Sequence, residues 1–499
     1  MTEFELKFEI PSAKLKGVSV AMLEGKATRQ RLQASYFDTA NGALAAHGIV
    51  VRLRKEGRRW VQTAKGPTAD LLERLEHNAA LPSQSAAAMP ALDLSRHRET
   101  PVGKVIDKVL GFKSGGNYPR LHLLYKTDVQ RITRHIASGA SVVEVALDQG
   151  RVFTGGHSQP VCELEFELKQ GTPLDAVALA RQWCACYGLW MSTIAKSMKG
   201  QRLCSANAVS AATSATSHKF LPKFSQHASG EEMITAIVRS CLSQILPNMS
   251  ELAGGSNHPD HIHQLRVGIR RLRTAIRELG GLTDTPEPMW EAVLMQVFRA
   301  LGDHRDHSYL MLVLQPQLLT AGGPDIRLSD ANSHIPDPGE TVRSEHFQDA
   351  LIGLVGFVHR KVLKTANTSD ALKKTISLRL GKLHKLALRD GKKFLALAEA
   401  RQHAVRKRLK RLRYLVEFAA PLFAVRKVNH MTTELKPVLD ALGLHNDELM
   451  ALHAWCAVVE DDVNAWFGIG WLSARRQPNA NRCLKEIKAF SQIKPFWYR

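Results

Sequence analysis

The hydrophobic pattern of this 499-residue chain changes its period along the sequence, and this change most limits the folds that the chain can adopt. Up to Cys204, apolar and charged residues alternate in several segments, which is typical of strands with one buried face. After His218, apolar residues recur at helical spacing over long segments. Residues 205–218 between them are rich in Ser, Ala and Thr, lack Lys, Arg, Asp and Glu, and predict a flexible linker. We therefore expect an α+β protein of two domains, residues 1–204 and 219–499.

Both regions carry an excess of positive charge. The chain holds 68 Lys and Arg residues against 47 Asp and Glu residues, a formal net charge of +21. Such a charge attracts polyanions, namely nucleic acid, acidic membranes or phosphate chains. Seven cysteines without a CxxC pair make a secreted disulfide framework unexpected. The sequence also shows neither a signal-peptide pattern nor an apolar run of membrane length, so we expect a soluble cytoplasmic protein without membrane contact.

Several expected strands carry all their charges on one face, because successive side chains of a strand point to opposite sides. The first strand places Glu3, Glu5, Lys7 and Glu9 on one face, and residues 162–169 do the same with Glu163, Glu165, Glu167 and Lys169. Residues 143–152 place Glu144 and Asp148 together. Residues 49–65 predict a hairpin that carries Arg52 and Arg54 on one face and ends at Lys65.

A charged strand face most often points to water on a half-buried sheet. Two features favour another interpretation: three carboxylates on one strand face repel each other unless cations hold them, and the acids and bases lie on different strands. Mg²⁺ takes oxygen ligands and shares them with phosphates, while Arg and Lys bind the remaining phosphate oxygens. A closed barrel with these faces inside would hold a metal–polyphosphate complex, but alternation alone does not decide which face is inside.

An ordered series of motifs in residues 1–204 resembles the CYTH, or triphosphate tunnel metalloenzyme, superfamily. The series is Glu3-x-Glu5-x-Lys7, YFDT at 36–39, RLR at 52–54, TAKGP at 63–67, Arg74-x-Glu76, Glu144-x-x-x-Asp148-x-Gly150, CELEFELK at 162–169 and AKSMKGQRL at 195–203. This resemblance implies an eight-stranded antiparallel β tunnel with flanking helices, which binds a triphosphate together with Mg²⁺ or Mn²⁺.

The same resemblance implies roles for individual residues. The implied metal ligands are Glu3, Glu5, Glu165 and Glu167, with Asp148 and Glu163 as further candidates. The implied phosphate contacts are Lys7, Arg52, Arg54 and Lys65 at the catalytic centre and Arg131, Lys196 and Arg202 in substrate binding. For Glu163, Arg131 and Arg202, an ordinary ion pair inside the barrel is an equally good interpretation.

A basic helix occurs twice in the second region, in residues 260–279 and again near residue 410. His, Arg or Lys residues recur at the same offsets 140 positions apart: His263, Arg266, Arg270, Arg271 and Arg273, then His403, Arg406, Lys410, Arg411 and Arg413. Most of these offsets fall in one narrow sector of a helix, opposite an apolar face. The sequence LGxHxD follows each helix, at 301–306 and 442–447. We therefore expect an all-α domain of duplicated four-helix bundles.

A basic helix face is usually exposed to solvent, but a duplicated stripe with few acids favours an anionic ligand. We find no groove-reading, zinc-finger or RNA-binding aromatic motif, so we expect no sequence-specific nucleic-acid partner. The histidines lack a dense second set of metal ligands, so we favour hydrogen bonding to phosphate.

Residues 219–499 resemble the CHAD domain, a helical module often fused to CYTH domains and associated with polyphosphate. The resemblance implies polyphosphate contacts at His263, Arg266, Arg270, Arg271, Arg273, Arg305, His403, Arg406, Lys407, Lys410, Arg411 and Arg413. The position of Arg305 is Asn446 in the second repeat, so the two repeats need not bind anions alike.

The combined architecture resembles the bacterial CYTH–CHAD inorganic triphosphatases. It implies hydrolysis of tripolyphosphate to pyrophosphate and phosphate with Mg²⁺ or Mn²⁺, and a helical domain that binds long-chain polyphosphate. The sequence does not decide whether that domain recruits polyphosphate, places the protein at polyphosphate granules or regulates the barrel. Three alternatives stay open: hydrolysis of thiamine or nucleoside triphosphates, cyclisation of ATP, and a non-catalytic polyphosphate scaffold. Clustered carboxylates argue against the scaffold, because a pure anion binder would not keep them in its site. No general base can be named from the sequence.

Overall fold

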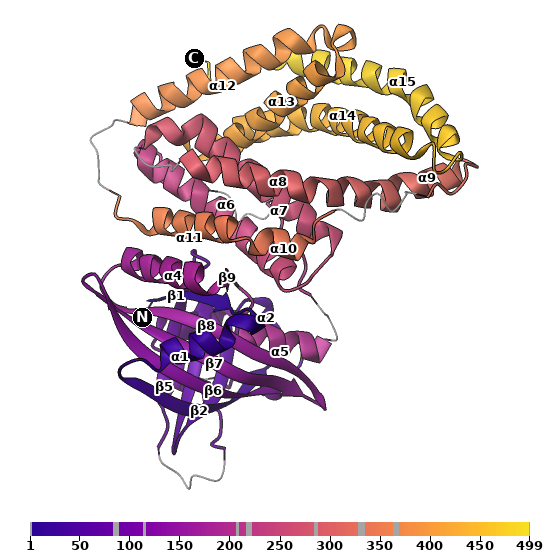
Figure 1. Ribbon diagram of the computed structural model, residues 1–499. Helices are drawn as coiled ribbons and strands as arrows, with labels where there is room; N and C mark the ends of the chain where they lie inside the picture. The colour runs from indigo at the N-terminus through magenta and orange to yellow at the C-terminus, as the bar shows by residue number, and fades with distance from the viewer. Residues whose placement is uncertain are drawn as a thin grey trace. The chain divides into compact units, whose positions relative to one another are not determined.

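The computed structural model describes residues 2–82, 89–112, 116–205, 209–215, 222–283, 288–327, 335–362 and 369–498 (Figure 1). The chain divides into two compact units. The first comprises Met1–Thr213, Leu246–Ser256 and Val342–Arg360, and the second comprises Ser214–Ile245, Asn257–Thr341 and Lys361–Arg499. Parts of the expected linker, residues 206–208 and 216–218, lie outside the described residues, and the domain limits at 204 and 219 stay a prediction.

The first unit contains a closed barrel of eight antiparallel strands, which confirms the expected fold. The strands are β1 (Thr2–Glu9), β2 (Ala27–Asp38), β3 (Val50–Glu56), β4 (Arg59–Pro67), β5 (Glu73–Ala80), β6 (His122–Ser138), β7 (Ser141–Thr154) and β8 (His157–Gln170). Their order is β5-β4-β3-β2-β6-β7-β8-β1, and pairing of β1 with β5 closes the ring. The short strand β9 (Trp190–Met191) also pairs with β1.

The apolar face of the strands packs outward against helices, so the charged face points into the barrel. Phe8 and Phe166 are fully buried and contact each other edge to face at 5.5 Å. Phe166 also meets Trp183 of helix α4 (Pro173–Tyr187) at 5.9 Å. Proline at the first turn and Gly188 with a φ of 60° just after the last residue define the two ends of α4. Helix α4 thereby covers the apolar side of β8.

Other short helices complete the wall of the barrel. They are α1 (Leu15–Met22), α2 (Ala43–Ala46), α3 (Pro101–Leu110) and α5 (Lys196–Ser205). Val102 and Ile106 of α3 pack with Val51 and Ala64 on the outer side of β3 and β4. These contacts bury apolar residues on the outside of the sheet and leave the inside to the charged side chains.

Helix α11 (Glu345–His359) also belongs to the first unit, although its sequence lies far beyond the barrel strands. It packs against α4, where Arg181 forms two hydrogen bonds of 2.7 Å with the carboxylate of Asp349 (Figure 1). Buried Gln348 accepts a hydrogen bond of 2.8 Å from the backbone N–H of Met191 in β9. The barrel unit is therefore assembled from segments that are distant in sequence.

The second unit is helical among its described residues, as expected. The helices of this part of the chain are α6 (Gly230–Ala253), α7 (Pro259–Leu279), α8 (Pro288–Tyr309), α9 (Gln315–Thr320), α10 (Pro338–Arg343), α12 (Ser369–Gly391), α13 (Glu399–Ala419), α14 (Val425–Val458) and α15 (Ala465–Ser491). The C-terminal ends of α6, from Leu246, and of α10, from Val342, belong to the first unit. Helices α12 to α15 pack as a four-helix bundle, and the two basic helices, α7 and α13, contact each other.

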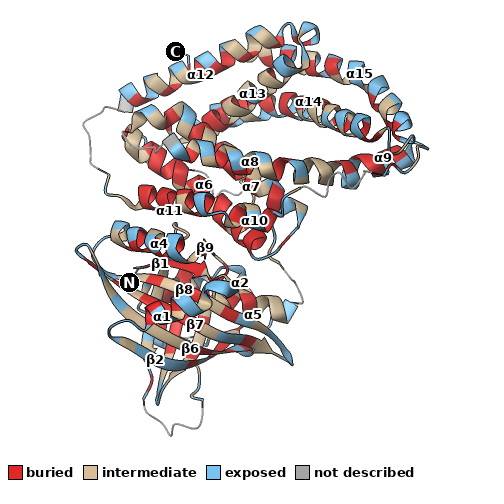
Figure 2. Cartoon of the chain, in the orientation of Figure 1, coloured by how far each residue is buried: buried red, intermediate tan, exposed pale blue. Residues whose placement is uncertain are grey.

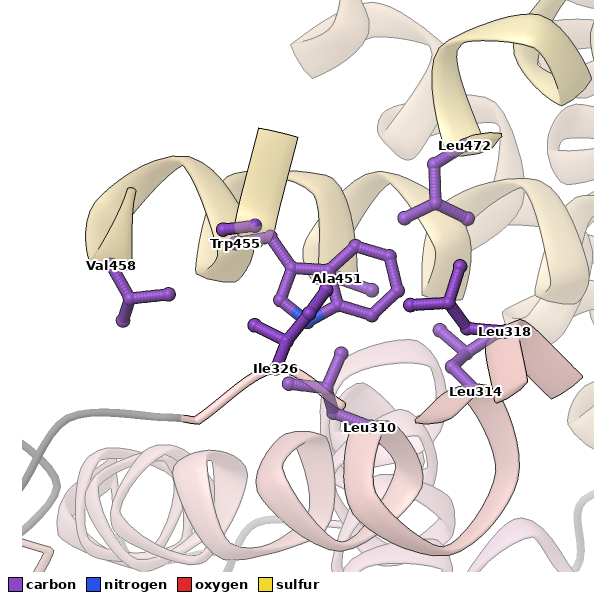
Figure 3. Close-up of a cluster of buried hydrophobic side chains, with 9 residues drawn as sticks. Leu310, Leu314, Leu318, Ile326, Ala451, Trp455, Val458 and Leu472 are labelled. Carbon is purple, nitrogen blue, oxygen red and sulfur yellow. The ribbon is translucent and has the colours of Figure 1, made fainter. Parts of the chain in front are cut away.

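One apolar core of the second unit surrounds Trp455, which is fully buried on α14 (Figure 3). Leu310, Leu314 and Leu318, from the π-helical turn after α8 and from α9, pack against it together with Leu472 of α15. Gly468 of α15 leaves room for the indole, because a Cβ there would lie 2.6 Å from the Trp455 ring. Buried residues line the inner faces of these helices, whereas their outer faces are exposed (Figure 2). Among the described residues, no helix combines the length and apolar character needed to cross a membrane.

Candidate active site and anion-binding cavity

The charged side chains predicted from the alternation line the inside of the barrel. They surround two cavities, of about 660 Å³ and about 120 Å³, that share part of their lining. The shared residues are Glu3, Glu5, Tyr36, Arg52, Lys65, Glu165 and Lys196. The structure thus decides the question that alternation left open: the charged face is the inner one.

Three carboxylates from β7 and β8 form a compact acidic cluster. Oxygen atoms of Asp148, Glu163 and Glu165 all lie within 4.8 Å of one another. The register explains this closeness, because Asp148 pairs directly with Glu163 and Glu165 follows two positions later on the same face. Asp148 and Glu163 are almost completely buried. Buried carboxylates at this spacing need a cation between them.

Two basic side chains hold this acidic cluster together. Lys196 Nζ, at the start of α5, lies 2.7 Å from both Asp148 Oδ2 and Glu165 Oε1 and also contacts Glu163. Arg131 of β6 binds Asp148 through two hydrogen bonds of 2.6 Å, and its Nη2 lies 2.5 Å from Glu165 Oε2. The Lys196 ammonium group therefore stands among the carboxylates where a cation is required.

Strand β1 brings Glu5 and Lys7 to the same region. Burial, followed by repulsion from Glu165, raises the pKa of the Glu5 carboxyl group. Burial lowers the pKa of the Lys7 ammonium group, whose Nζ lies 3.9 Å from Glu163 Oε2 and donates to the carbonyl oxygen of Ile194. In both groups, burial thus disfavours the charged form.

A second group of charges centres on Lys65 of β4. Lys65 Nζ lies 3.0 Å from Glu3 Oε2 and 2.6 Å from Glu76 Oε2. Burial, together with a hydrogen bond to Glu76, raises the pKa of Glu3 to about 9. At neutral pH, Glu3 is therefore largely protonated when no metal ion is bound.

Strand β3 supplies the two arginines of the predicted phosphate site. The Nη1 atom of Arg52 donates to the Tyr36 hydroxyl at 3.5 Å, and the Tyr36 ring stacks on Tyr125 with 4.7 Å between centroids. Arg54 lines the larger cavity and donates through Nε to Glu56 Oε1 at 2.5 Å. Burial and the nearby Arg52 lower the pKa of Arg54. Both guanidinium groups therefore lie on the wall of the larger cavity, where they could bind an anion.

Two predicted site residues lie outside the acidic cluster and its basic partners. Glu167 lines the larger cavity but pairs with Lys169 at 2.6 Å and is not part of the acidic cluster. Arg202 lines neither barrel cavity; it pairs with Glu251 of α6 and donates to Ser210 at 2.9 Å. We therefore leave Arg202 out of the phosphate site, in line with its alternative interpretation as an ordinary ion pair.

Some residues of the site had no role assigned from the sequence. Tyr36 and Glu76 lie in motifs of the resemblance, and alternation could have placed Glu76 on the inner face. Lys199 lies one helical turn after Lys196, with Nζ at 3.0 Å from Glu9 and 3.7 Å from Glu163. By contrast, Asp38 of the YFDT motif is structural, since its carboxylate accepts hydrogen bonds from backbone N–H groups at the start of α2.

The second unit has its own charged cavity, of about 520 Å³, between the basic helices α7 and α13 and helices α8 and α14. Ten of the twelve residues predicted to bind polyphosphate line it: His263, Arg266, Arg270, Arg273, Arg305, His403, Arg406, Lys407, Lys410 and Arg411. Arg277, Arg299 and Tyr414 add to this lining. The duplicated stripes therefore face one shared cavity.

Arg271 and Arg413 do not line this cavity. Arg271 is 1% exposed, donates to Gln244 Oε1 at 2.9 Å and lies over the Phe418 ring at 5.6 Å. Arg413 instead pairs with Glu417 on its own helix at 2.8 Å. The two helices therefore differ at two positions of the repeat. Arg411 lines the cavity but its counterpart Arg271 does not, and Arg273 lines it but its counterpart Arg413 does not.

The cavity of the second unit is dominated by cations. Burial, followed by the nearby Arg270 and Arg406, lowers the pKa of Lys410 to about 5. Burial also lowers the pKa of Arg266 to about 10. Asp447 is occupied by Arg305 at 2.8 Å, and among the described residues no carboxylate lies within 4.0 Å of Lys410 Nζ. An anion in this cavity would meet paired cations, such as Arg273 with Glu291 at 2.7 Å, as well as Lys410, which has no carboxylate at that distance in the described part of the chain.

The histidines of the two basic helices, His263 and His403, are suited to hydrogen bonding. Burial lowers the pKa values of His263 and His403. His403 Nδ1 lies 2.6 Å from Asn446 Oδ1 and donates to it, because the amide oxygen is an acceptor. This contact also shows how Asn446, at the repeat position of Arg305, takes a different role.

Comparisons with known proteins agree with this geometry. The family model of the CYTH domain matches residues 1–196, and that of the CHAD domain matches residues 236–455. An inorganic triphosphatase of Haemophilus influenzae is 26% identical over 172 residues, which are 34% of this chain and 45% of that protein. The chain thus matches less than half the length of this relative.

Two solved structures are also similar. The CHAD domain of Ricinus communis matches 55% of this chain and 95% of its own, with 22% identity and a TM-score of 0.44. A putative adenylyl cyclase of Hippeastrum, described as having a dominant triphosphatase activity, matches 42% of this chain and 97% of its own, with 18% identity and a TM-score of 0.32. Since these scores are low, the assignment rests on the family models, which identify a CYTH domain in residues 1–196 and a CHAD domain in residues 236–455 of the chain.

Proposed function

We propose that the barrel hydrolyses inorganic tripolyphosphate to pyrophosphate and phosphate with the help of Mg²⁺ or Mn²⁺, and that the cavity of the second unit binds long-chain polyphosphate. The observation that carries the first part is the enclosed arrangement of acids and bases around one pair of cavities. Asp148, Glu163 and Glu165 lie on one side, while Arg52 and Lys65 reach the same space.

The acidic cluster suits a hard divalent cation. Its carboxylate oxygens converge within 4.8 Å, and a lysine ammonium group already stands among them. Oxygen ligands of this kind are those that Mg²⁺ and Mn²⁺ prefer. We assign Glu5, Glu165, Glu163 and Asp148 as ligands, with Glu3 after it loses its proton. When bound, such an ion would neutralise phosphate oxygens and make the transferred phosphorus more electrophilic.

The basic residues of the barrel act on the substrate directly. Arg52, Arg54 and Lys65 bind its non-bridging oxygens, and Lys65 exchanges a carboxylate partner for phosphate as it does so. In phosphoryl transfer, positioning and charge stabilisation supply most of the rate enhancement. Because these groups are buried, their charges are poorly screened and their contribution is large.

Arg131 and Lys196 have a different role. Both hold carboxylates of the acidic cluster, at distances of 2.5–2.6 Å where Arg131 is the donor. We propose that they keep these side chains oriented before the substrate complex arrives, and that Lys196 then turns toward phosphate. The displaced ammonium group remains close enough to neutralise charge on the substrate.

The second unit supports polyphosphate binding by its unbalanced charge. Arg270 donates to the Tyr414 hydroxyl at 3.0 Å and Arg266 lies over the Phe298 ring at 4.5 Å, so both guanidinium groups are oriented by neutral partners. Oriented cations without a carboxylate partner favour a flexible polyanion over a metal complex. Such binding would also account for a location at polyphosphate granules.

The proposed reaction is tested by measuring phosphate release from tripolyphosphate with Mg²⁺, with Mn²⁺ and with a chelator. We expect turnover that requires a metal ion. Thiamine triphosphate and ATP are assayed alongside, with cyclic AMP measured in the ATP reaction. Faster turnover of thiamine triphosphate or ATP, or formation of cyclic AMP, would show that tripolyphosphate is not the preferred substrate. If none of the three compounds is turned over, the protein acts as a polyphosphate-binding scaffold.

A further inference from the structure

A buried histidine at the end of helix α11 contacts a loop of the barrel. The side chain of His359 is 4% exposed, and its Nε2 atom lies 3.3 Å from Oδ2 of Asp70, whose side chain is 12% exposed. The imidazole also meets the ring of Phe4 edge to face, with 4.8 Å between centroids. Phe4 lies between Glu3 and Glu5 on β1, so the contact is made directly behind two proposed metal ligands.

One ring nitrogen of His359 is hydrogen-bonded to its own helix. Its Nδ1 atom lies 2.9 Å from the carbonyl oxygen of Val355, which can only accept, so Nδ1 carries a hydrogen. A neutral ring would then turn the lone pair of Nε2 toward the carboxylate of Asp70. Nε2 is thus the ring nitrogen that faces the carboxylate of Asp70, within ion-pair distance.

The loop that carries Asp70 forms part of the barrel cavity. Leu71 and Leu72 line the smaller cavity together with Glu3 and Glu5. The carbonyl oxygen of Leu72 accepts a hydrogen bond of 3.2 Å from the N–H of Glu5. Asp70 connects these contacts, because its Oδ1 accepts from the N–H of Leu72 at 2.9 Å while its Oδ2 faces His359.

Helix α11 is itself firmly attached to the barrel unit, so it can hold this loop. Asp349 and Gln348 fix its first half to α4 and β9. Gly356, near its end, packs closely on α4, because a Cβ there would lie 3.1 Å from Val177. His359 is therefore presented from a fixed support and not from a mobile end.

We propose that His359 is a positioning residue of the barrel site: through Asp70 it keeps residues 68–72 on the wall of the cavity and, through Leu72, keeps Glu5 in register. The inference rests on the proposed function and extends it to a residue outside the matched CYTH region, residues 1–196. It implies that the sequence between the two basic repeats contributes to the active site of the barrel.

Kinetics of full-length variants test the proposal. If loss of the ion pair leaves the loop in place one-tenth of the time, His359→Gln and Asp70→Asn raise KM for tripolyphosphate about tenfold with little change in kcat. His359→Phe keeps a ring against Phe4 but lacks the ring nitrogen that faces Asp70, and we expect the same rise. The double variant should be no worse than the poorer single variant, since both changes break one interaction.

A matched control lies on the same helix. His346 is exposed, and His346→Gln should leave both constants unchanged. A purely structural role would lower the active fraction and thus kcat, without raising KM. Unchanged KM in His359→Gln, His359→Phe and Asp70→Asn would overturn the proposal.

Hydrogen exchange gives a readout that does not depend on the reaction. In His359→Gln and His359→Phe, the amides of residues 68–72 and of Glu5 should exchange faster than in the parent protein, while β6 and β7 keep their protection. Unchanged exchange at residues 68–72 would refute the positioning role even if the protein hydrolyses another substrate. Conversely, inactivity toward tripolyphosphate with altered exchange would refute the proposed function alone.

Discussion

The barrel and the helical unit each enclose a charged cavity, but they balance their cations differently. In the barrel, Lys65 pairs with two carboxylates, and Lys196 contacts three. In the helical unit, Lys410 has no carboxylate within ion-pair distance among the described residues, and Arg266 lies against an aromatic ring. The two cavities therefore use similar types of residue but differ in the balance between cations and carboxylates.

This difference indicates that the balance of acids and bases in a cavity determines which class of ligand the cavity binds. Paired acids and bases create a site that is nearly neutral until a metal ion and phosphate enter together. A large excess of cations over acids creates a site that favours any flexible polyanion and responds strongly to salt. The comparison therefore predicts that acid-to-amide changes act on the barrel and that loss of cations acts on the helical cavity.

The largest effect is expected for Glu5→Gln. Loss of this carboxylate should lower metal-dependent tripolyphosphate hydrolysis by about 10²–10³-fold, the usual cost of removing one group that stabilises charge in the transition state. Binding of labelled long-chain polyphosphate should stay unchanged. Glu24→Gln is the control, because the side chain of Glu24 is 67% exposed. Turnover equal to that of the parent protein would exclude Glu5 as a ligand.

A smaller effect is expected from the helical cavity. The double variant Arg270→Gln/Lys410→Gln should weaken long-chain polyphosphate binding about 10–100-fold, since each contact with a charged group contributes strongly. The slope of log affinity against log salt should fall by about 1.4, taking the single-strand value of about 0.7 per charge. Arg413→Gln on the same helix lies outside the cavity and serves as control. Equal losses in both variants would mean that the cavity is not the binding site.

The pH dependence should distinguish the two cavities further. Lys410, with its pKa lowered to about 5 by burial, is largely neutral at pH 7 and must take up a proton when phosphate binds. Polyphosphate affinity should therefore fall as pH rises from 6 to 8, by up to about tenfold per pH unit for one linked proton. Titration calorimetry in buffers of different ionisation enthalpy measures this uptake.

The sign of the stability change is opposite. Between pH 5 and 10.5 the folded unit without ligand binds fewer protons at Lys410 than the unfolded chain does, so its stability rises with pH. Lys410→Arg, which keeps its proton, should flatten the dependence of affinity on pH. A slope unaffected by Lys410→Arg would assign the linked proton to another group, such as His263 or His403.

The smallest effect on activity is expected for Arg202→Gln. Because Arg202 pairs with Glu251 outside the barrel cavities, kcat/KM for tripolyphosphate should stay within about twofold of the parent value, as expected for changes away from a site. The free energy of unfolding should fall by about 3 kcal/mol, since Glu251 loses its partner in a buried setting. Arg131→Gln, by contrast, should lower kcat/KM. A large loss of activity in Arg202→Gln would return Arg202 to the phosphate site.

Several parts of the site were predictable because they depend on local periodicity. Alternation on β1 and β8 groups Glu3 with Glu5 and Glu163 with Glu165, and the structure keeps these groupings. Helical offsets in the second region likewise bring His263 and His403 to one cavity. Contacts with distant segments were not predictable: Arg202 pairs with Glu251, and Arg271 donates to Gln244.

What the sequence by itself determined is which side chains share a face, because the periods of strands and helices are properties of the backbone. Only the tertiary structure decided which face is inside. The eight strands close into a ring whose apolar face is covered by α3 and α4, so the charges are turned inward. It also brought α11, with His359, to the barrel, because such a contact depends on packing between segments hundreds of residues apart and leaves no local pattern in the chain.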